Sequence, residues 1–345
     1  MNGCDEEKVL IPGLPEDIAL DCLARVPHRF HQGLRPVCRR WCQLVTSPEF
    51  YLHRERIGTA EDLIFLVQAR PVEKVEGGVD LVTAGESKAE FRLPRCSLVA
   101  YNVTMDVWGR VGEVPVFARA AAAEGKVVVM GGWDPESLEP MREVGVVDPV
   151  TGRRRVGKAM TTARSFFAAA AMDGRVFVAG GHDSQKNALK TAEAYDVEMD
   201  DWVELPAMEE ERDECQGAVV GGKFWAVSGY RTEGQGRFDP MAECYDPATE
   251  GWIKVEGIWE EGGGAPSAAF FAAAEGERLG YVDGRGAREY EKGWKGAVAG
   301  PEGMRAVAVA AATGERVFAM GTEVDGRGHV GWVLEKWEVE TGSDA

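Results

Sequence analysis

The alternation of apolar and polar residues divides the chain into a short helical segment and a long series of strands. In residues 10–55, apolar side chains recur at helical spacing, first at Ile18, Cys22 and Val26. A second periodic segment runs from Leu34 to Val45, and Pro27 and Pro48 mark where the two segments end. Because helices this short cannot bury all of their apolar surface alone, we expect the remaining chain or a partner protein to cover part of it.

From residue 61 onward the pattern is that of repeated β-strands. Five alanine-rich stretches each meet a glycine turn and continue into a β-branched or aromatic run, with glycine spacings of 49, 48, 54 and 38. Leu63–Val67 is a sixth, earlier copy of the apolar run. Alanine favours helices, but each stretch is only a few residues long and is followed at once by a hairpin signal. We therefore predict the alanine-rich stretches as inner strands of propeller blades, where backbones crowd together.

Each copy also contains a polar turn and, in three copies, a tryptophan seven residues after a tyrosine. These pairs are Tyr101–Trp108, Tyr195–Trp202 and Tyr245–Trp252. The Asp or Asn after the tyrosine makes the turn between the two outer strands, and the tryptophan fills the space between blades. Gly-Gly, Tyr-Asp and Trp at this spacing resemble the kelch signature. The resemblance implies an all-β kelch propeller of about six blades over residues 61–345.

The predicted propeller has unequal numbers of inner and middle strands. The sequence contains six middle strands but only five inner strands, and the last copy leaves no room for another. An unpaired inner edge exposes backbone groups that can pair with another chain and cause aggregation, so we expect this edge to be protected. We expect either a first blade of three strands, which leaves the ring incompletely closed, or closure by the linker near Val72–Leu93.

The N-terminal segment contains a motif that begins with Leu14-Pro15-Glu16-Asp17-Ile18 and ends with Val37-Cys38-Arg39-Arg40-Trp41. With this motif the segment resembles an F-box. In F-box proteins this small all-α module binds the Skp1-type adaptor of a cullin-RING ubiquitin ligase, and the resemblance implies the same for residues 10–55. It assigns to the adaptor-binding face, or to its support, the residues Leu14, Pro15, Ile18, Leu23, Val26, Pro27, Val37, Cys38 and Trp41. The alternative is an ordinary helical cap on the propeller.

The repeats are similar to those of the plant kelch F-box subfamily, most clearly at Arg164-Ser165-Phe166-Phe167 and Arg212-Asp213-Glu214-Cys215. Members of that subfamily deliver phenylalanine ammonia-lyase, or the type-B response regulators of cytokinin signalling, to ubiquitination and degradation. The resemblance therefore implies a non-catalytic substrate receptor of an SCF (Skp1-cullin-F-box) ligase. It would act in phenylpropanoid control or in cytokinin signalling.

Propellers bind their partners with the loops at one end of the central channel. Four arginines precede predicted inner strands and are expected to surround the same opening: Arg119, Arg164, Arg212 and Arg305. With Phe166, Phe167 and His182 they form the predicted target site, and their guanidinium groups suit carboxylates of a protein target. The alternative is that each arginine pairs with a neighbouring acid, such as Asp213 or Glu214.

Charge is distributed unevenly along the chain. The net charge is −18, whereas residues 1–60 are neutral, so the whole excess of acid lies in the predicted propeller. An acidic domain repels phosphate backbones, so we expect no nucleic-acid partner, while a basic protein would be attracted. No apolar run approaches the roughly 20 residues that a membrane span needs, and we expect no membrane partner.

The seven cysteines are scattered without CxxC spacing, and three lie at apolar positions of the helical segment. We expect buried free thiols in a reducing compartment, the cytoplasm or the nucleus. The five histidines lack metal-ligand spacing, and we expect no metal and no cofactor. Two other interpretations stay open: a kelch enzyme, which needs a metal constellation, and a plain interaction scaffold.

Overall fold

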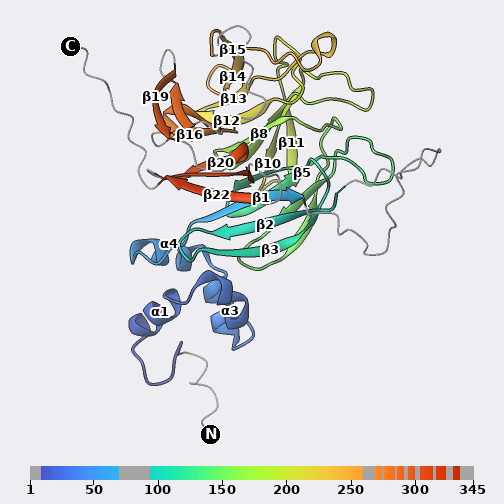
Figure 1. Cartoon of the computed structure of the whole chain (residues 1–345). Coiled ribbons are helices and arrows are strands. Elements are labelled where there is room, and N and C mark those ends of the chain that lie inside the picture. The colour runs from blue at the N-terminus through green and yellow to red at the C-terminus, as the bar shows by residue number, and fades with distance from the viewer. Residues whose placement is uncertain are drawn as a thin grey trace, which may run out of the picture.

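The computed structural model describes residues 9–69, 94–258, 269–273, 276–283, 286–290, 294–299, 304–313, 316–323 and 329–334. Its helices are α1 (Glu16–Ala24), η2 (His28–Phe30), α2 (His31–Leu34), α3 (Arg39–Val45), α4 (Pro48–Arg56) and, between two strands, η3 (Thr232–Gly234). The segment predicted as one helix from Leu34 to Val45 is interrupted between Leu34 and Arg39, because Pro36 has no backbone N–H to donate and Cys38 is extended, with φ of −158°. Figure 1 shows α1, α3 and α4 together at one end of a body made of strands.

The strands form six sheets within the described part of the chain. The first sheet contains β1 (Leu63–Ala69), β2 (Cys96–Asn102) and β3 (Val107–Val114). The second contains β4 (Arg119–Ala123), β5 (Lys126–Met130), β6 (Val144–Val147) and β7 (Arg154–Gly157), and the third contains β8 (Ala168–Met172), β9 (Arg175–Ala179), β10 (Ala192–Asp196) and β11 (Asp201–Leu205). The fourth contains β12 (Gln216–Val220), β13 (Lys223–Val227), β14 (Ala242–Asp246) and β15 (Gly251–Val255), and the fifth contains β16 (Ala269–Ala273), β17 (Arg278–Val282), β18 (Gly286–Tyr290) and β19 (Trp294–Ala299). The last contains β20 (Met304–Thr313), β21 (Arg316–Glu323) and β22 (His329–Leu334).

The alanine-rich stretches are inner strands, as predicted. The first strands of neighbouring sheets, β4, β8, β12, β16 and β20, pack against one another in this order. A Cβ atom added to Gly217 of β12 would lie 2.5 Å from the backbone nitrogen of Ala169 in β8. Small side chains are therefore required here because the inner backbones nearly touch. The predicted fold class, a helical module followed by a kelch propeller, is confirmed.

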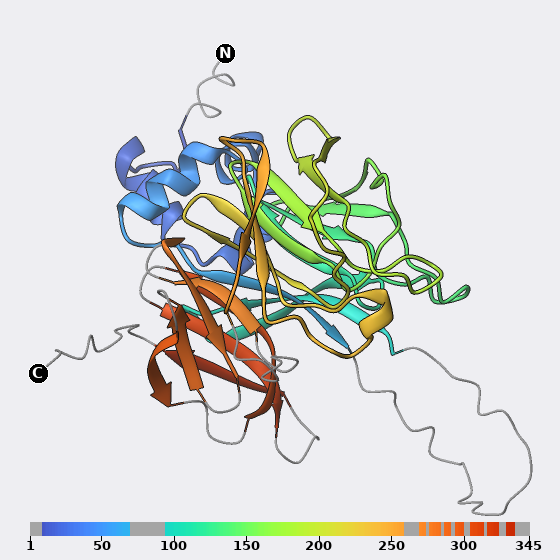
Figure 2. The ribbon, with the colours of Figure 1, turned by 90° about the horizontal axis from the view of Figure 1, so that it is seen from above.

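Among the described residues the first blade has three strands, which agrees with the first of the two expected solutions for the ring. Tyr101 lies in β2 and the corresponding Tyr195 lies in the third strand of its blade, so β1 is the counterpart of a middle strand. The inner position of this blade is not filled by a described strand, and β1 packs against β4 directly. The last sheet (red) lies beside the first (blue) in Figures 1 and 2, where Arg316 pairs with Asp62 at 3.6 Å. The linker near Val72–Leu93 lies outside the described residues.

Two of the three predicted tryptophans pack between blades. The indole nitrogens of Trp202 and Trp252 donate to the carbonyls of Lys158 and Pro206 in the preceding blades, at 2.7 and 2.6 Å. Trp108 is different, since it is half exposed and stacks on Tyr101 of its own sheet. For Trp108 the predicted role between blades is therefore wrong.

The described cysteines are free, but not all are buried as predicted. Cys96, Cys215 and Cys244 are buried, whereas Cys22 and Cys38 are exposed. In α1 the buried face carries Ala19 and Leu23, which places Cys22 on the other side of the helix. The prediction of buried thiols is wrong for Cys22 and Cys38, because the apolar stripe of these helices is only partly covered by the rest of the chain.

Candidate functional site

The helical segment leaves a row of apolar side chains uncovered. Leu14, Ile18 and Val37 are 37%, 46% and 57% exposed, and Pro15 and Cys38 are exposed beside them. We call these five residues the apolar strip. All five belong to the predicted adaptor-binding face, so the structure brings them to the surface without a covering element from the described propeller.

The remaining residues of the predicted face are less exposed than the strip and belong to the interior of the helical segment or its border. Leu23 is buried in the core of the helical segment, and Val26 and Pro27 are half-buried. Trp41 is half-buried too, and its indole nitrogen donates to the carbonyl of Leu10 at 2.6 Å. Cys38 fixes the start of α3, because its Sγ accepts from the backbone N–H of Trp41 at 3.4 Å.

At one end of the propeller, the loops repeat a strained backbone position. Phe117, Phe166 and Glu214 each stand two residues before an inner strand, with φ of 60°, 56° and 53°. This left-handed region costs roughly 1–2 kcal/mol for residues other than glycine, and such strain gathers at functional sites. The residue before each of these three forms an isolated β-bridge with a second loop of the same blade, at the residue that follows a glycine. The bridges are Val116–Trp133, Ser165–His182 and Asp213–Tyr230. We call these three joined loop pairs, with the turn at 183–187, the mouth.

Aromatic rings from two blades gather at the mouth. The Phe117 ring centroid lies 4.6 Å from that of Phe166 and 5.2 Å from that of Trp133. The ring of Phe166 also stacks on His182 at 5.5 Å. The Lys186 ammonium lies 3.6 Å above the Trp133 ring, and burial lowers the pKa of this lysine. The result is a partly exposed aromatic surface that carries one cation, a composition suited to anchoring a protein partner.

Polar contacts hold the aromatic cluster in place. His182 Nδ1 donates to both carboxylate oxygens of Asp213 at 2.9 Å, and the Trp133 indole donates to Ser165 Oγ at 2.8 Å. Ser165 Oγ lies 3.4 Å from His182 Nε2, so the side chains of Ser165, His182 and Asp213 contact one another in the order found in a hydrolase triad. Ser165 is fully buried, however, and its hydroxyl is already bonded to Trp133. The network therefore joins three blades and orients the rings of the mouth.

His182 is only 4% exposed and its side chain stacks on the ring of Phe166, so it does not itself offer the surface to a target that the sequence predicted. The structure also buries three other residues that the sequence assigned to target binding. Arg164 and Arg212 are 0% exposed and pair with Glu193 and Glu243, at 3.0 and 3.2 Å. Phe167 is also 0% exposed and packs in the core between blades. For these three the prediction is wrong, because their side chains turn into the blades and no target can reach them. The alternative, pairing of each arginine with an acid, is correct for both, although the acids lie two strands away rather than next in sequence.

Arg119 and Arg305 do not share the position of Arg164 in the repeat. Pro115 occupies that position in the second blade, and Arg119 is the first residue of the inner strand β4. Arg119 is half-buried and donates to the carbonyls of Phe167 and Cys215, at 3.0 and 3.4 Å, so it reaches across the next two blades. Burial lowers its pKa. Arg305 lies in β20, and its side chain is outside the described part of the structure.

Sequence reasoning found Phe166 and His182 but missed Phe117, Trp133 and Lys186. Phe117 precedes Phe166 by 49 residues and Trp133 precedes His182 by 49, so the repeat spacing contains the signal for both. Lys186 gives no such signal, because its contact with Trp133 depends on the turn closed by the bond from Asp183 N to the carbonyl of Asn187.

No three His, Cys, Asp or Glu side chains converge as metal ligands within the described residues. In the same ranges, no helix is long and apolar enough to cross a membrane.

Comparison with known proteins identifies two parts of the chain. A model of the F-box domain matches residues 11–53, and a model of the kelch motif matches residues 163–209. The chain is also similar to the YjhT structure, with a TM-score of 0.58 and 12% identity, over 69% of this chain and 87% of that one. At this identity the likeness concerns the fold alone.

Among curated proteins of Arabidopsis thaliana, the F-box/kelch-repeat protein SKIP20 is 44% identical over 280 residues. F-box/kelch-repeat protein At2g44130 is 43% identical over 269 residues, and At1g15670 is 36% identical over 252. The matches span 72%, 72% and 70% of this chain, and 67%, 66% and 68% of these relatives in the same order. The chain therefore aligns with about two thirds of the length of each relative.

Proposed function

The chain belongs to the family of F-box/kelch-repeat proteins, and from this premise we propose that it is the substrate-recognition subunit of an SCF ubiquitin ligase. Its helical segment would hold a Skp1-type adaptor, and through it cullin, while the propeller holds a protein target. The chain performs no chemistry in this role. It raises the concentration of the target beside the charged ubiquitin carrier.

The apolar strip is the observation that carries this proposal. Leu14, Ile18 and Val37 come from two separate parts of the helical segment, which the ion pair of Glu16 with Arg40 joins, and all three remain exposed. Burying a single side chain of this kind stabilises a complex by about 1.5–3 kcal/mol, so a partner that covers all three gains a substantial affinity. A helical cap that served only the propeller would bury this strip against the strands instead.

The mouth is the proposed docking site for the target. Phe117, Phe166 and Trp133 offer partly exposed rings on a strained and well-bonded loop framework, and the buried His182 stacks on Phe166. Rigid aromatic anchors of this kind contribute much of the energy of protein interfaces. Arg119 remains part of the proposal as a cation deeper in the channel.

For the target itself we propose phenylalanine ammonia-lyase or a type-B response regulator, in the cytoplasm or the nucleus. The support for these targets is the resemblance of the Arg164–Phe167 and Arg212–Cys215 loops to the plant subfamily. These two loops contain Phe166 and Asp213 and form part of the mouth, so residues shared with the subfamily border the surface that would meet the target.

Co-purification with a Skp1-type adaptor tests the proposed function. Ile18→Asp and Val37→Asp place a charge on the strip and are expected to abolish binding, because an unpaired carboxylate in the interface is costly. Met199→Asp is the matched control, since Met199 is 75% exposed and lies in a propeller turn. Full adaptor binding by both strip variants, or none by the wild-type chain, would contradict the proposal.

A further inference from the structure

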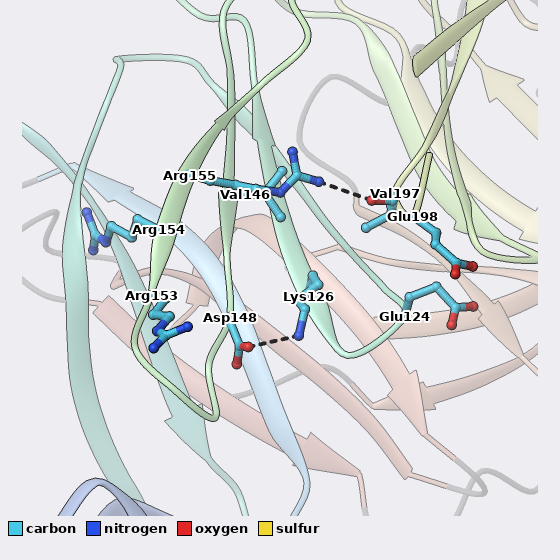
Figure 3. Close-up of a pocket in the computed structure, with 9 residues that line it drawn as sticks. All are labelled: Glu124, Lys126, Val146, Asp148, Arg153, Arg154, Arg155, Val197 and Glu198. Atoms are coloured by element: carbon cyan, nitrogen blue, oxygen red, sulfur yellow. Dashed lines mark hydrogen bonds and ion pairs between the residues drawn. The ribbon is translucent and has the colours of Figure 1, made fainter. Parts of the chain in front are cut away.

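Two adjoining cavities flank the second blade, one toward the third blade and one toward the helical segment. One has a volume of about 600 Å³ and is drawn in Figure 3, with Arg153 and Asp148 in its wall. The other, of about 700 Å³, is walled by Arg29 of η2 on one side and by the first two blades on the other. Asp148 and Arg154 line both cavities, so they form one concave surface. We call this surface the basic cleft.

A hydrogen bond connects the helical segment to the second blade beside the cleft. Arg35 donates to the carbonyl of Thr151 at 2.6 Å. Asp148 shapes the turn that carries Thr151, because its carboxylate accepts from the backbone N–H groups of Val150 and Thr151 at 2.9 Å. The same carboxylate pairs with Lys126 at 2.9 Å, as the dashed line in Figure 3 marks. The charge of Asp148 is therefore already used within the protein.

Three guanidinium groups of the cleft meet no carboxylate among the described residues. Arg153 is exposed and its side chain forms no bond there. Arg154 donates to the backbone carbonyl of Val111, which leaves its charge uncompensated. Arg29 lies over the ring of Phe30, with 4.7 Å between its guanidinium carbon and the ring centroid. Glu124 and Glu198 also line the first cavity. With Asp148 they make three acidic side chains against six lysine and arginine side chains, so the cleft keeps a net positive charge.

This surface differs from the rest of the propeller in its charge. The chain has a net charge of −18, yet residues 153–158 contain four basic side chains and no acid. One explanation is protection of the edge strand β7, because charges on an edge oppose pairing with another chain. That explanation does not cover Arg29, which lies in the helical segment, or Arg154, which reaches across to the first blade.

We infer that the basic cleft binds an acidic segment of the same adaptor that covers the apolar strip, an inference that rests on the proposed function. Arg29 follows Pro27 of the predicted adaptor-binding face by two residues, so a partner on that face lies next to the cleft. Guanidinium groups accept carboxylates in a two-pronged geometry that fixes orientation. The contact would thus speed association and fix the direction in which the propeller points from the adaptor.

The test compares Arg153→Glu with Arg142→Glu in the full chain. Both arginines are exposed, and neither side chain forms a bond among the described residues, so neither change should disturb folding. The two variants have the same net charge, because each replaces one arginine with one glutamate. Arg142 precedes β6 and lies at the opposite end of the blade from Arg153, away from the cleft. Calorimetric titration with a purified Skp1-type adaptor is expected to show about tenfold weaker binding by Arg153→Glu than by Arg142→Glu at low salt. The difference should shrink at high salt, where exposed charges are screened.

Equal affinities of the two variants would overturn this inference and leave the proposed function standing. Failure of the wild-type chain to bind the adaptor would overturn both. An Arg153→Glu variant that binds the adaptor normally but captures less phenylalanine ammonia-lyase or response regulator would assign the cleft to the target. That outcome would overturn the inference as well.

Discussion

Arg164 and Glu193 form an ion pair of 3.0 Å in which each side chain is 1% exposed. The guanidinium group also donates to the carbonyls of Gly180 and Thr191, at 2.8 and 2.9 Å. It thereby ties the loop before the inner strand β8 to the second and third strands of the same blade. The pair stabilises the blade. Its two charged groups are buried and neutralise each other, so a target cannot contact them.

Among the second, third and fourth blades, whose loops before the inner strands are described, the ion pair is present or absent as a unit. The fourth sheet repeats it with Arg212 and Glu243 at 3.2 Å. In the second sheet the strand registers place Pro115 and Gly145 at the two equivalent positions, so both charges are missing together. A buried arginine without its carboxylate would be costly, which explains why a blade has both partners or neither.

Arg164→Met is expected to lower the free energy of unfolding by about 3–5 kcal/mol, because it leaves the buried carboxylate of Glu193 unpaired. The double variant Arg164→Met, Glu193→Leu should recover most of this loss, since no buried charge remains. Urea unfolding of the three proteins measures both effects. If Arg164→Met keeps its stability but no longer captures a target, Arg164 belongs to the recognition site and its structural role is refuted.

Local signals in the sequence predicted the blades. The glycine turns and the alanine-rich stretches mark each inner hairpin, and β4 and β8 lie where these signals place them. The same count predicted a first blade of three strands as one of two alternatives, because no alanine-rich stretch precedes β1, and three strands are described there. The exposure of Ile18 and Val37 also agrees with the prediction, since short amphipathic helices leave apolar surface uncovered.

The direction of individual side chains could not be predicted in the same way. Arg164 and Phe166 are two residues apart in one loop, yet one is buried and the other lies at the mouth. The difference depends on Glu193, 29 residues later on the third strand of the blade, and on the left-handed backbone of Phe166. A sequence pattern within one loop contains neither piece of information.

Phe166→Gly should separate recognition from stability. Glycine adopts the left-handed backbone of this position without strain, so the gain from relieved strain offsets the lost ring contacts and stability changes by less than about 1 kcal/mol. The rings of Phe117 and His182 lose their shared neighbour, and target capture should fall at least tenfold. Pull-down of phenylalanine ammonia-lyase and of type-B response regulators measures capture.

Asp173→Gly is the control for this experiment. Asp173 has a φ of 50° in the hairpin turn between β8 and β9, at the opposite end of the blade. Its replacement relieves the same kind of strain and should leave capture unchanged. Undiminished capture by Phe166→Gly would exclude the mouth as the docking site.

The helical segment should lose stability in mild acid because of His31. Burial lowers the pKa of His31 from 6.5 to about 4, and burial lowers that of His28 as well. The unfolded chain therefore binds a proton on His31 near pH 6.5, whereas the folded chain resists it until about pH 4. Stability is complete above the unfolded pKa and falls as the pH drops from 6.5 toward 4, by on the order of 3 kcal/mol for this residue.

Unfolding measured at several pH values between about 7 and 5 tests the role of His31. His31→Gln keeps a polar side chain near the carbonyl of Val26 and the hydroxyl of Tyr51, which the imidazole contacts at 2.8 and 3.0 Å. This variant is less stable at neutral pH, but its stability should depend less steeply on pH. Identical slopes for the variant and the wild-type chain would show that His31 is not the source.

Gly217→Ala tests whether crowding of the inner strands sets their composition. The added Cβ would lie 2.5 Å from the nitrogen and 2.6 Å from the oxygen of Ala169, and neither backbone atom can move without breaking a strand pairing. We expect a loss of about 1–3 kcal/mol in the free energy of unfolding. Gly145→Ala in β6 is the matched control, because no heavy atom lies within 4 Å of its added Cβ and the change should be neutral or slightly stabilising. Equal effects of the two substitutions would mean that the inner strands can separate, and that their small residues have another cause.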